Sequence, residues 1–297
     1  MRASLAALLL AGAAFTASGC MAGQPAGEAA SSAPAVALAV PLPDAAVPLP
    51  PAVTRPAPPP LSPAQVEAEV ARLRRALARE VPNAILPSAD DRRWIDRARQ
   101  GAAASGHAVD HPQLLVVVDR NPHVQAMRIV MARPDGPWEI VGGSRVSTGQ
   151  AGRHDYYITP VGMFLHTEDI LDYRAQGTFN ENHIRGIGTK GMRVWDFGWQ
   201  WATKGWRADR EGGEIRLELH ATDPEFLEQR IGRPASEGCI RVPSAMNRFL
   251  DRHGVLDADY ERAAADDIRY RALLLPDRVP TPLAGDALVV VDSGAGG

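Results

Sequence analysis

Two residues in the second half of the sequence have the types and the spacing needed for nucleophilic catalysis. His220 ends the segment that begins at Glu214, and Cys239 lies in the run RPASEGCIRV, in which Ser236 follows the histidine by sixteen positions. A thiol with a pKa of about 8.5 is mostly protonated at neutral pH, so a base must activate it. The pair predicts a Cys239 nucleophile with His220 as its base.

The segment before His220 predicts the strand that positions it. Three aliphatic residues between 215 and 219 alternate with polar ones, which is the period of a half-buried strand. His220 is therefore expected at the strand's end, facing away from the apolar layer. Gly238 permits a tight turn before the cysteine, and the backbone N–H groups around Gly238 and Cys239, in the loop that begins at Ser236, are predicted to hold the oxyanion of a tetrahedral intermediate.

The pattern resembles the L,D-transpeptidase (YkuD-type) family of peptidoglycan enzymes. That family's signature is a histidine, a gap of about this length, Ser/Thr-His-Gly-Cys, and a hydrophobic residue followed by Asn or Arg. A first apolar strand, Ser-Thr-Gly ending at Gly149, and Thr-Pro-x-Gly-x-Phe beginning at Thr159 recur in the same order. The resemblance covers residues 112–292, and Glu237 stands where the family usually has histidine.

The resemblance implies a reaction, a fold and a set of partners. Cys239 would form an acyl-enzyme with a peptidoglycan tetrapeptide stem, release D-alanine and pass the acyl group to an amine on another stem or on a protein. Arg241 matches the family residue that meets a substrate carboxylate, and a structural salt bridge is its alternative role. The family fold is a mainly β sandwich with a few helices. The family needs no cofactor and no metal, and it is acylated by carbapenem-type β-lactams.

Glu237 leaves two other functions open. A carboxylate aimed at Cys239 would raise the thiol's pKa, whereas one aimed outward could meet a cationic substrate group or pair with Arg241. The first alternative to transfer is hydrolysis of the same acyl-enzyme, which would make the protein an L,D-carboxypeptidase or amidase. The second alternative is a non-catalytic peptidoglycan-binding lipoprotein in which the thiol is silent.

Two further groups of residues invite a functional interpretation. His166, Glu168, Asp169 and His183 are of metal-ligating types, but their spacing matches no compact ligand motif, and no metal is expected. Four of the six tryptophans fall between residues 195 and 206. This stretch predicts either an aromatic flap over the substrate or a small aromatic core.

The N-terminus predicts export. Residues 1–19 read as a signal peptide, because Arg2 precedes a short apolar run that is too short for a permanent membrane helix. The Ser-Gly-Cys ending predicts lipidation of Cys20, and Met21 after it favours a periplasmic protein anchored to the outer membrane. The alternative is ordinary cleavage that leaves a soluble secreted protein. Acylated Cys20 could not pair, which would leave Cys239 as a lone thiol in an oxidising compartment.

The remaining sequence divides into a tether and a folded part. Residues 20–62 form an Ala/Pro-rich tether that holds 11 of the 25 prolines within 22–62, a composition that cannot build a core. Residues 63–111 predict a helical pair, and the catalytic domain of 112–292 predicts strands near 114–119, 124–132, 138–146 and 286–292. A helix is expected over 244–253. The formal net charge of −3 argues against a nucleic-acid partner, and contact with membrane is expected only through the lipid anchor.

Overall fold

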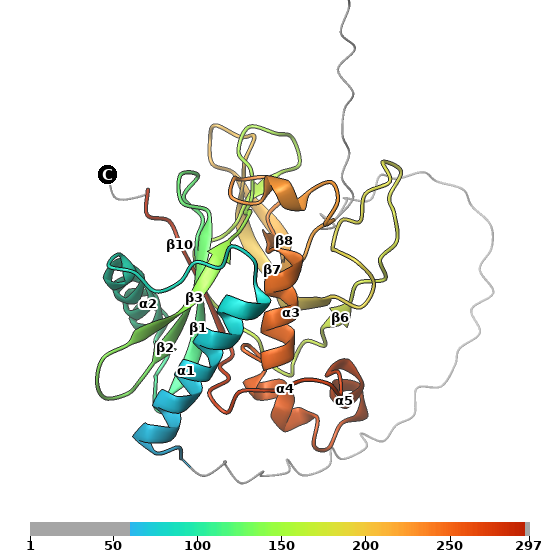
Figure 1. Cartoon of the computed structure of the whole chain (residues 1–297). Coiled ribbons are helices and arrows are strands. Elements are labelled where there is room, and N and C mark those ends of the chain that lie inside the picture. Colours follow the sequence, from blue (N-terminus) through green and yellow to red (C-terminus); the bar gives the residue numbers. More distant parts are fainter. Residues whose placement is uncertain (1–59, 295–297) are drawn as a thin grey trace, which may run out of the picture.

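The structure, a computed structural model, describes residues 60–294 and contains two mixed β-sheets with helices around them (Figure 1). The first sheet has the strand order β3-β2-β1-β10-β5, and the second has the order β4-β7-β8-β9, with β6 paired to β7. The strands of the first sheet are β1 (Gln113–Asp119), β2 (Ala126–Ala132), β3 (Glu139–Arg145), β5 (Gly162–Leu165) and β10 (Ala287–Val291). Those of the second are β4 (Tyr157–Ile158), β6 (Tyr173–Arg174), β7 (Arg193–Lys204), β8 (Gly212–His220) and β9 (Ile240–Arg241).

The uninterrupted apolar sequence of β1 is explained by burial on both faces of the first sheet. Leu114, Val116 and Val118 point into a core cluster that also contains side chains of β7, β8 and β9. Leu115 and Val117 belong to a second cluster on the opposite face. Both sheets therefore contribute to one apolar core, and the strands expected near residues 114–119, 124–132, 138–146 and 286–292 correspond to β1, β2, β3 and β10.

Two helices precede the sheets and cover opposite faces of the first one. The helix α1 (Pro63–Glu80) begins with the expected cap, because the Ser62 side chain accepts a hydrogen bond from the Gln65 N–H and Pro63 occupies the first turn. Its apolar residues join the core shared by both sheets. The helix α2 (Asp91–Ser105) packs Trp94 into the cluster on the other face.

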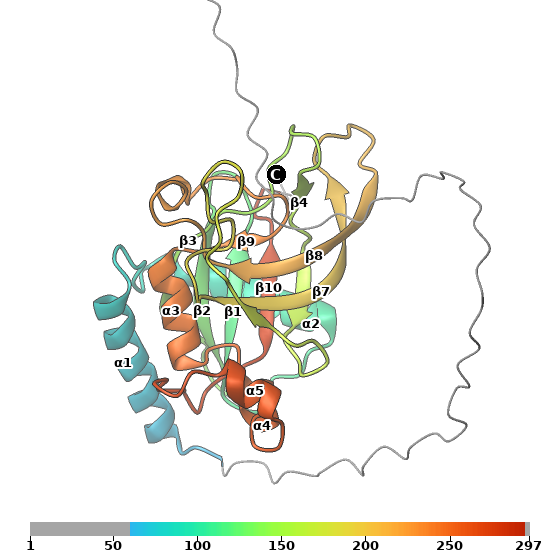
Figure 2. The ribbon, with the colours of Figure 1, turned by 90° about the vertical axis from the view of Figure 1, so that its right-hand side faces the viewer.

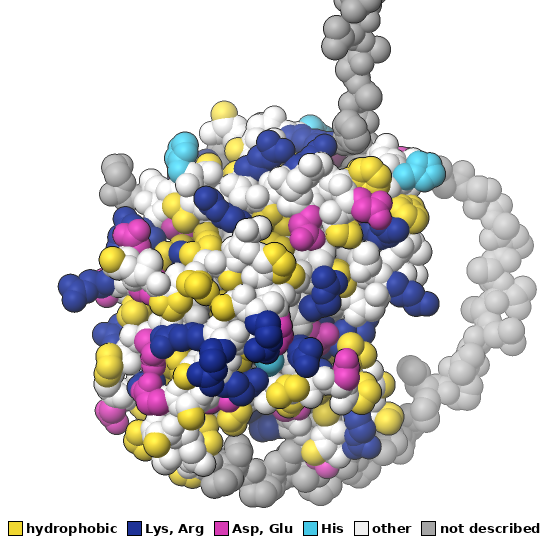
Figure 3. All heavy atoms as spheres, in the orientation of Figure 1, with side chains coloured by type: hydrophobic (Ala, Val, Ile, Leu, Met, Phe, Trp, Pro, Cys, Tyr) yellow, Lys and Arg dark blue, Asp and Glu magenta, His cyan; other side chains and the backbone are white. Residues whose placement is uncertain are grey.

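The C-terminal helices pack beside the second sheet. The helix α3 (Ser244–His253) has the bounds expected from the sequence and runs beside α1 (Figures 1 and 2). The short helices α4 (Ala258–Ala263) and α5 (Ile268–Leu273) follow it, and a 3-10 turn, η1 (Glu228–Arg230), lies in the connection between β8 and β9. On the face that Figure 3 shows, basic and acidic side chains are mixed with apolar ones. Within residues 60–294, no helix has the length and apolar character to cross a membrane.

The tryptophan-rich stretch consists of the strand β7, which carries Trp195, Trp199 and Trp201, and of the turn after it, which carries Trp206. Trp195 is fully buried in the main core, whereas Trp199 and Trp201 are 50% and 70% exposed. Trp206 packs against a small cluster that includes Tyr157. The four rings therefore do not form a common aromatic core. The predicted signal peptide, the lipidation site at Cys20 and most of the tether lie outside the described residues.

Candidate active site

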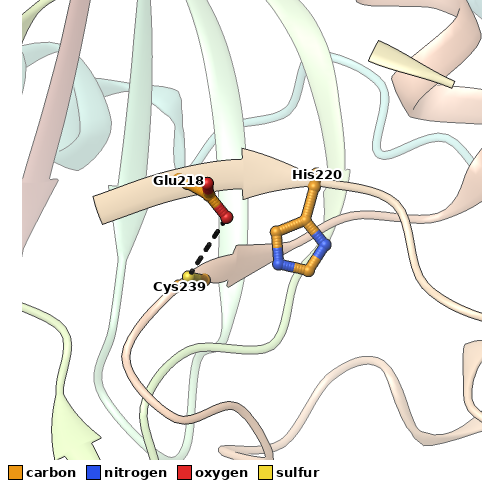
Figure 4. Close-up of side chains that lie close together, drawn as sticks. All are labelled: Glu218, His220 and Cys239. Atoms are coloured by element: carbon orange, nitrogen blue, oxygen red, sulfur yellow. Dashed lines mark hydrogen bonds between the residues drawn. The ribbon is translucent and has the colours of Figure 1, made fainter. Parts of the chain in front are cut away.

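The pairing of β8 with β9 brings the predicted catalytic residues together. The two strands are parallel, with Leu219 opposite Ile240, and both of these side chains enter the core. Because side chains alternate along a strand, the residues on either side of them point to the other face. Figure 4 shows the result: Glu218 and His220 project from β8 toward Cys239, which immediately precedes β9, and one ligand-type atom of each residue lies within 4.8 Å of the others.

The imidazole of His220 is held by the backbone. Its Nδ1 lies 2.5 Å from the carbonyl oxygen of Ala221, which makes Nδ1 the protonated nitrogen. The other ring nitrogen, Nε2, faces Cys239 (Figure 4). Ala221 has no side-chain acceptor, so the sequence required a backbone or remote group for this task, and the backbone carbonyl fills it.

The environment of His220 favours the neutral ring. Burial, and then the nearby charge of Arg241, lower the pKa of His220 to about 4. In this environment the resting imidazole is neutral, so it is suited to receive a proton rather than to hold one in advance.

The sulfur of Cys239 is buried and close to two oxygens. Cys239 is 1% exposed, and its Sγ lies 3.6 Å from the Arg216 carbonyl oxygen and 4.0 Å from Oε2 of Glu218. Cys239 is disulfide-bonded in this structure. The lone thiol expected from the sequence is therefore not the state present here, and any nucleophilic chemistry requires the reduced form.

Glu218 is a site residue that the sequence analysis did not select. Its side chain is 8% exposed, and Oε1 accepts a hydrogen bond of 2.9 Å from the Tyr173 hydroxyl on β6. Burial raises the pKa of Glu218 to about 7, so the carboxyl group titrates near neutral pH beside the sulfur. The signal was present in the alternation of β8, because Glu218 lies two positions before His220 and hence on the same face.

The loop that carries the nucleophile is fixed by short hydrogen bonds. The Ser236 hydroxyl donates to the Cys239 carbonyl at 2.5 Å and accepts from the Gly238 N–H at 3.3 Å. The Thr159 hydroxyl donates to the Gly238 carbonyl at 2.7 Å and accepts from the Gly149 N–H at 2.8 Å. Gly238 has φ +136°, and a Cβ there would lie 2.6 Å from the Ile215 side chain, so only glycine fits.

These contacts give the flanking motifs a structural role. The Ser-Thr-Gly segment, residues 147–149, is called the strip below. It pairs with the nucleophile loop, residues 236–241, through backbone β-bridges between Ser147 and Arg241 and between Gly149 and Ser236. The side-chain amide of Gln125 makes two hydrogen bonds to Thr148, of 2.8 and 2.9 Å, and so holds the strip in place. Thr159 of the Thr-Pro-x-Gly-x-Phe motif then joins the strip to the loop.

The oxyanion role predicted for the backbone near the cysteine stays a prediction. The Ser236 N–H donates to the Thr148 carbonyl at 3.0 Å, and the Gly238 N–H contacts the Ser236 hydroxyl. In this state both groups hold the loop together rather than face an open position.

Arg241 and Glu237 flank the nucleophile in the sequence and influence each other electrostatically. Arg241 is 8% exposed, and its Nη1 donates to the Ala235 carbonyl at 3.1 Å while its Nε has no hydrogen-bond partner. Burial raises the pKa of Glu237 to about 7, against the opposing charges of Arg241 and Arg153. Among residues 60–294, no carboxylate forms a close ion pair with Arg241, so its alternative role as a structural salt bridge is not observed.

Two cavities flank this group and share Ile184 in their walls. The larger has a volume of about 630 Å³ and is lined by Glu218, Arg216, Tyr173, Phe179 and Trp199 among others. The smaller has a volume of about 60 Å³ and is lined by Ser147, Thr222 and Arg241 among others. One wide, partly aromatic cavity therefore lies beside Glu218, and one narrow recess lies beside Arg241.

The metal interpretation of His166 and its neighbours is not supported. His166 is fully buried, and its two ring nitrogens contact the Leu256 carbonyl at 2.7 Å and the Asp172 carboxylate at 2.8 Å, so neither is available to an ion. His183 lies apart, against Phe179. In the described part of the chain, the one cluster with metal-ligand geometry is Glu218, His220 and Cys239 themselves, whose oxygen, nitrogen and sulfur are zinc-type donors.

Comparison with known proteins adds no relative to this description. No protein-family model matches the chain, and a search of curated proteins finds no match either.

Proposed function

We propose that this protein is a cysteine-dependent L,D-transpeptidase that acts on peptidoglycan stem peptides, with reduced Cys239 as the nucleophile. One observation carries the proposal: Nε2 of His220 faces the sulfur while Nδ1 is fixed by the Ala221 carbonyl. This is the arrangement that a thiol and its base need. The resemblance of the motifs to L,D-transpeptidases supplies the substrate class, and we propose that the two sheets form that family's β-sandwich.

The geometry supports a reaction in two steps, acylation of Cys239 and transfer of the acyl group to an amine. As the Cys239 sulfur attacks the carbonyl of the third, diaminopimelate-type residue, His220 takes the thiol proton. The tetrahedral intermediate then collapses, the peptide C–N bond breaks, and His220 returns the proton to the amine of the departing D-alanine. In the second step an acceptor amine attacks the thioester, its proton passes through His220, and Cys239 leaves as the thiol.

The N-terminal sequence completes the proposal. Lipidation of Cys20 would anchor the protein to the outer membrane and place the domain in the periplasm at the end of its tether. An acyl chain on Cys20 also removes one of the two cysteines of the chain from disulfide exchange, which favours the reduced form of Cys239.

Hydrolysis is the second candidate, and the position of Glu218 favours it. A carboxyl group with a pKa of about 7 beside the sulfur could act as base for a water molecule that attacks the thioester. The product would be a shortened stem, without a new cross-link.

Mass analysis of the reaction products tests these functions. The full chain under reducing conditions, and the Cys239→Ala variant as control, are incubated with a disaccharide-tetrapeptide. Loss of D-alanine together with a heavier cross-linked product supports transpeptidation, and loss of D-alanine alone supports hydrolysis. Equal behaviour of the two proteins would refute an enzymatic role and leave the non-catalytic binding protein.

A further inference from the structure

Three unsatisfied polar groups converge on the smaller cavity beside the catalytic pair. The Ser147 hydroxyl, the Thr222 hydroxyl and the Arg241 Nε are all buried without a hydrogen-bond partner, and all three residues line the recess of about 60 Å³. Ser147 and Thr222 are 2% and 1% exposed. A buried polar group without a partner is unfavourable, so three of them around one space point to a bound polar group that completes them.

The three groups come from separate segments that the fold brings together. Ser147 belongs to the strip beside β9, Arg241 lies on β9, and Thr222 follows β8 two positions after His220. Arg241 is directly opposite His220 in the strand pairing. A group bound in the recess is therefore next to the base that serves Cys239.

The chemistry of the walls selects a small anion. The charged residues that line the recess are Arg153, Arg230 and Arg241, and no acidic side chain is among the lining residues. A carboxylate has two acceptor oxygens, which suit two hydroxyl donors and a guanidinium N–H. A volume of about 60 Å³ suits a small polar group such as a carboxylate.

The resemblance already implies that Arg241 meets a substrate carboxylate; we propose that Ser147 and Thr222 complete this subsite in the recess and determine its specificity for the acyl donor. The inference rests on the proposed function, since it takes the donor to be a stem peptide. Two carboxylates of such a donor have the required chemistry: the terminal carboxylate of the departing D-alanine and the side-chain carboxylate of the third residue. Both lie close to the scissile carbonyl, as the recess lies close to the catalytic pair.

Binding measurements without turnover test the subsite. Donor tetrapeptides with both carboxylates free, with the side-chain carboxylate amidated, or with the terminal carboxylate amidated are titrated by calorimetry into full-length Cys239→Ala protein. Ser147→Ala and Thr222→Val are added singly to this background. Thr203→Val on β7, which lines neither of the two cavities at the site, is the matched control.

The expected result is a loss of affinity of about tenfold for the free donor in each of the two subsite variants and none in the control, the size of one hydrogen bond to a charged group. The donor that is amidated at the carboxylate bound in the recess should bind the Cys239→Ala protein more weakly than the free donor does. For this amidated donor, Ser147→Ala and Thr222→Val should lower the affinity no further. That arm identifies which carboxylate is bound. Circular dichroism and melting temperature report whether each variant folds.

Equal losses for free and both amidated donors, or no loss at all, would overturn the subsite and leave the recess to water molecules. If turnover of the wild type is intact in that case, the proposed function stands without it. If stem peptides bind none of the proteins, both the subsite and the proposed function fail. If the binding differences are found but the wild type does not turn over the donor, the subsite stands and the proposed function fails.

Discussion

At the scale of single residues, the environment of His220 holds its imidazole neutral. Because burial and Arg241 hold its pKa near 4, the imidazole is free to accept a proton across the neutral range. We expect His220→Ala to slow acylation of reduced protein by a carbapenem by about a hundredfold or more between pH 6 and 8. Mass spectrometry of the acylated protein gives the rate. An unchanged rate would remove His220 from the mechanism.

Glu218 should control how readily the Cys239 thiol ionises. Its pKa of about 7 means that the carboxyl group becomes negative as the pH rises through neutrality, 4.0 Å from the sulfur, and this charge opposes the thiolate. In reduced protein, Glu218→Gln should therefore increase the rate of alkylation by iodoacetamide about tenfold at pH 8, the effect of roughly one pKa unit. At pH 6, where Glu218 is neutral in the wild type, the two rates should converge.

The exposed Glu225 provides a matched charge-removal control, because its side chain is 65% exposed. Glu225→Gln should leave the alkylation rate unchanged at both pH values. A Glu218→Gln profile parallel to that of the wild type would show that this carboxylate does not act on the thiol.

At the scale of elements, the strands and helices follow from local sequence, and their environments do not. Alternation along β8 correctly separates Leu217 and Leu219 from Glu218 and His220. It could not predict that the polar face is also buried, because part of the cover comes from Tyr173 on β6, some 45 residues earlier in the sequence. Glu218 was missed for this reason, since a polar strand residue is ordinarily exposed.

The motif residues show the same division between local and long-range information. The pairing of the 147–149 strip with the nucleophile loop joins segments about 90 residues apart, and no periodicity reveals it. The resemblance placed these motifs in the domain without explaining them. Their hydrogen bonds show that they build the loop that carries Cys239.

Thr159 should be a critical link in that loop. It is fully buried, and replacement by Val would leave the Gly238 carbonyl and the Gly149 N–H without their partner. We expect Thr159→Val to lower the free energy of unfolding by about 3 kcal/mol, measured by urea denaturation, and to slow acylation of Cys239. Thr159→Ser keeps the hydroxyl and should restore most of both. Failure of serine to rescue would assign the effect to packing instead.

At the scale of the whole molecule, a buried ionic network connects β6, whose Tyr173 contacts Glu218, to the C-terminal helices. Asp172 precedes Tyr173, the partner of Glu218, and it pairs with both His166 and Arg193 at 2.8 Å. Arg193 also contacts Asp257, which lies just before α4. The network therefore anchors β6 to the body of the domain, and its strength depends on protonation of His166.

His166 is held as the charged imidazolium. Both ring nitrogens face acceptors, the Leu256 carbonyl and the Asp172 carboxylate, and the pKa of His166 is raised because the charge and hydrogen bond of Asp172 outweigh the burial that opposes them. A raised folded-state pKa gives stability that is fully present below the unfolded value of about 6.5 and is lost as the pH rises through the folded value.

We therefore expect His166→Gln to lower the free energy of unfolding by about 3 kcal/mol at pH 6, the low end for breaking a buried charged pair, because Arg193 still contacts Asp172. The difference between wild type and variant should shrink as the pH is raised toward 9, since the wild type then loses the imidazolium that the variant never had. Urea denaturation of both proteins at a series of pH values measures it. The exposed pair His111 and Asp110 offers the control, because His111→Gln should change stability little at any pH. A difference that is constant with pH would mean that neutral His166 stabilises the network as well as the imidazolium does. Packing rather than charge would then hold β6 in place.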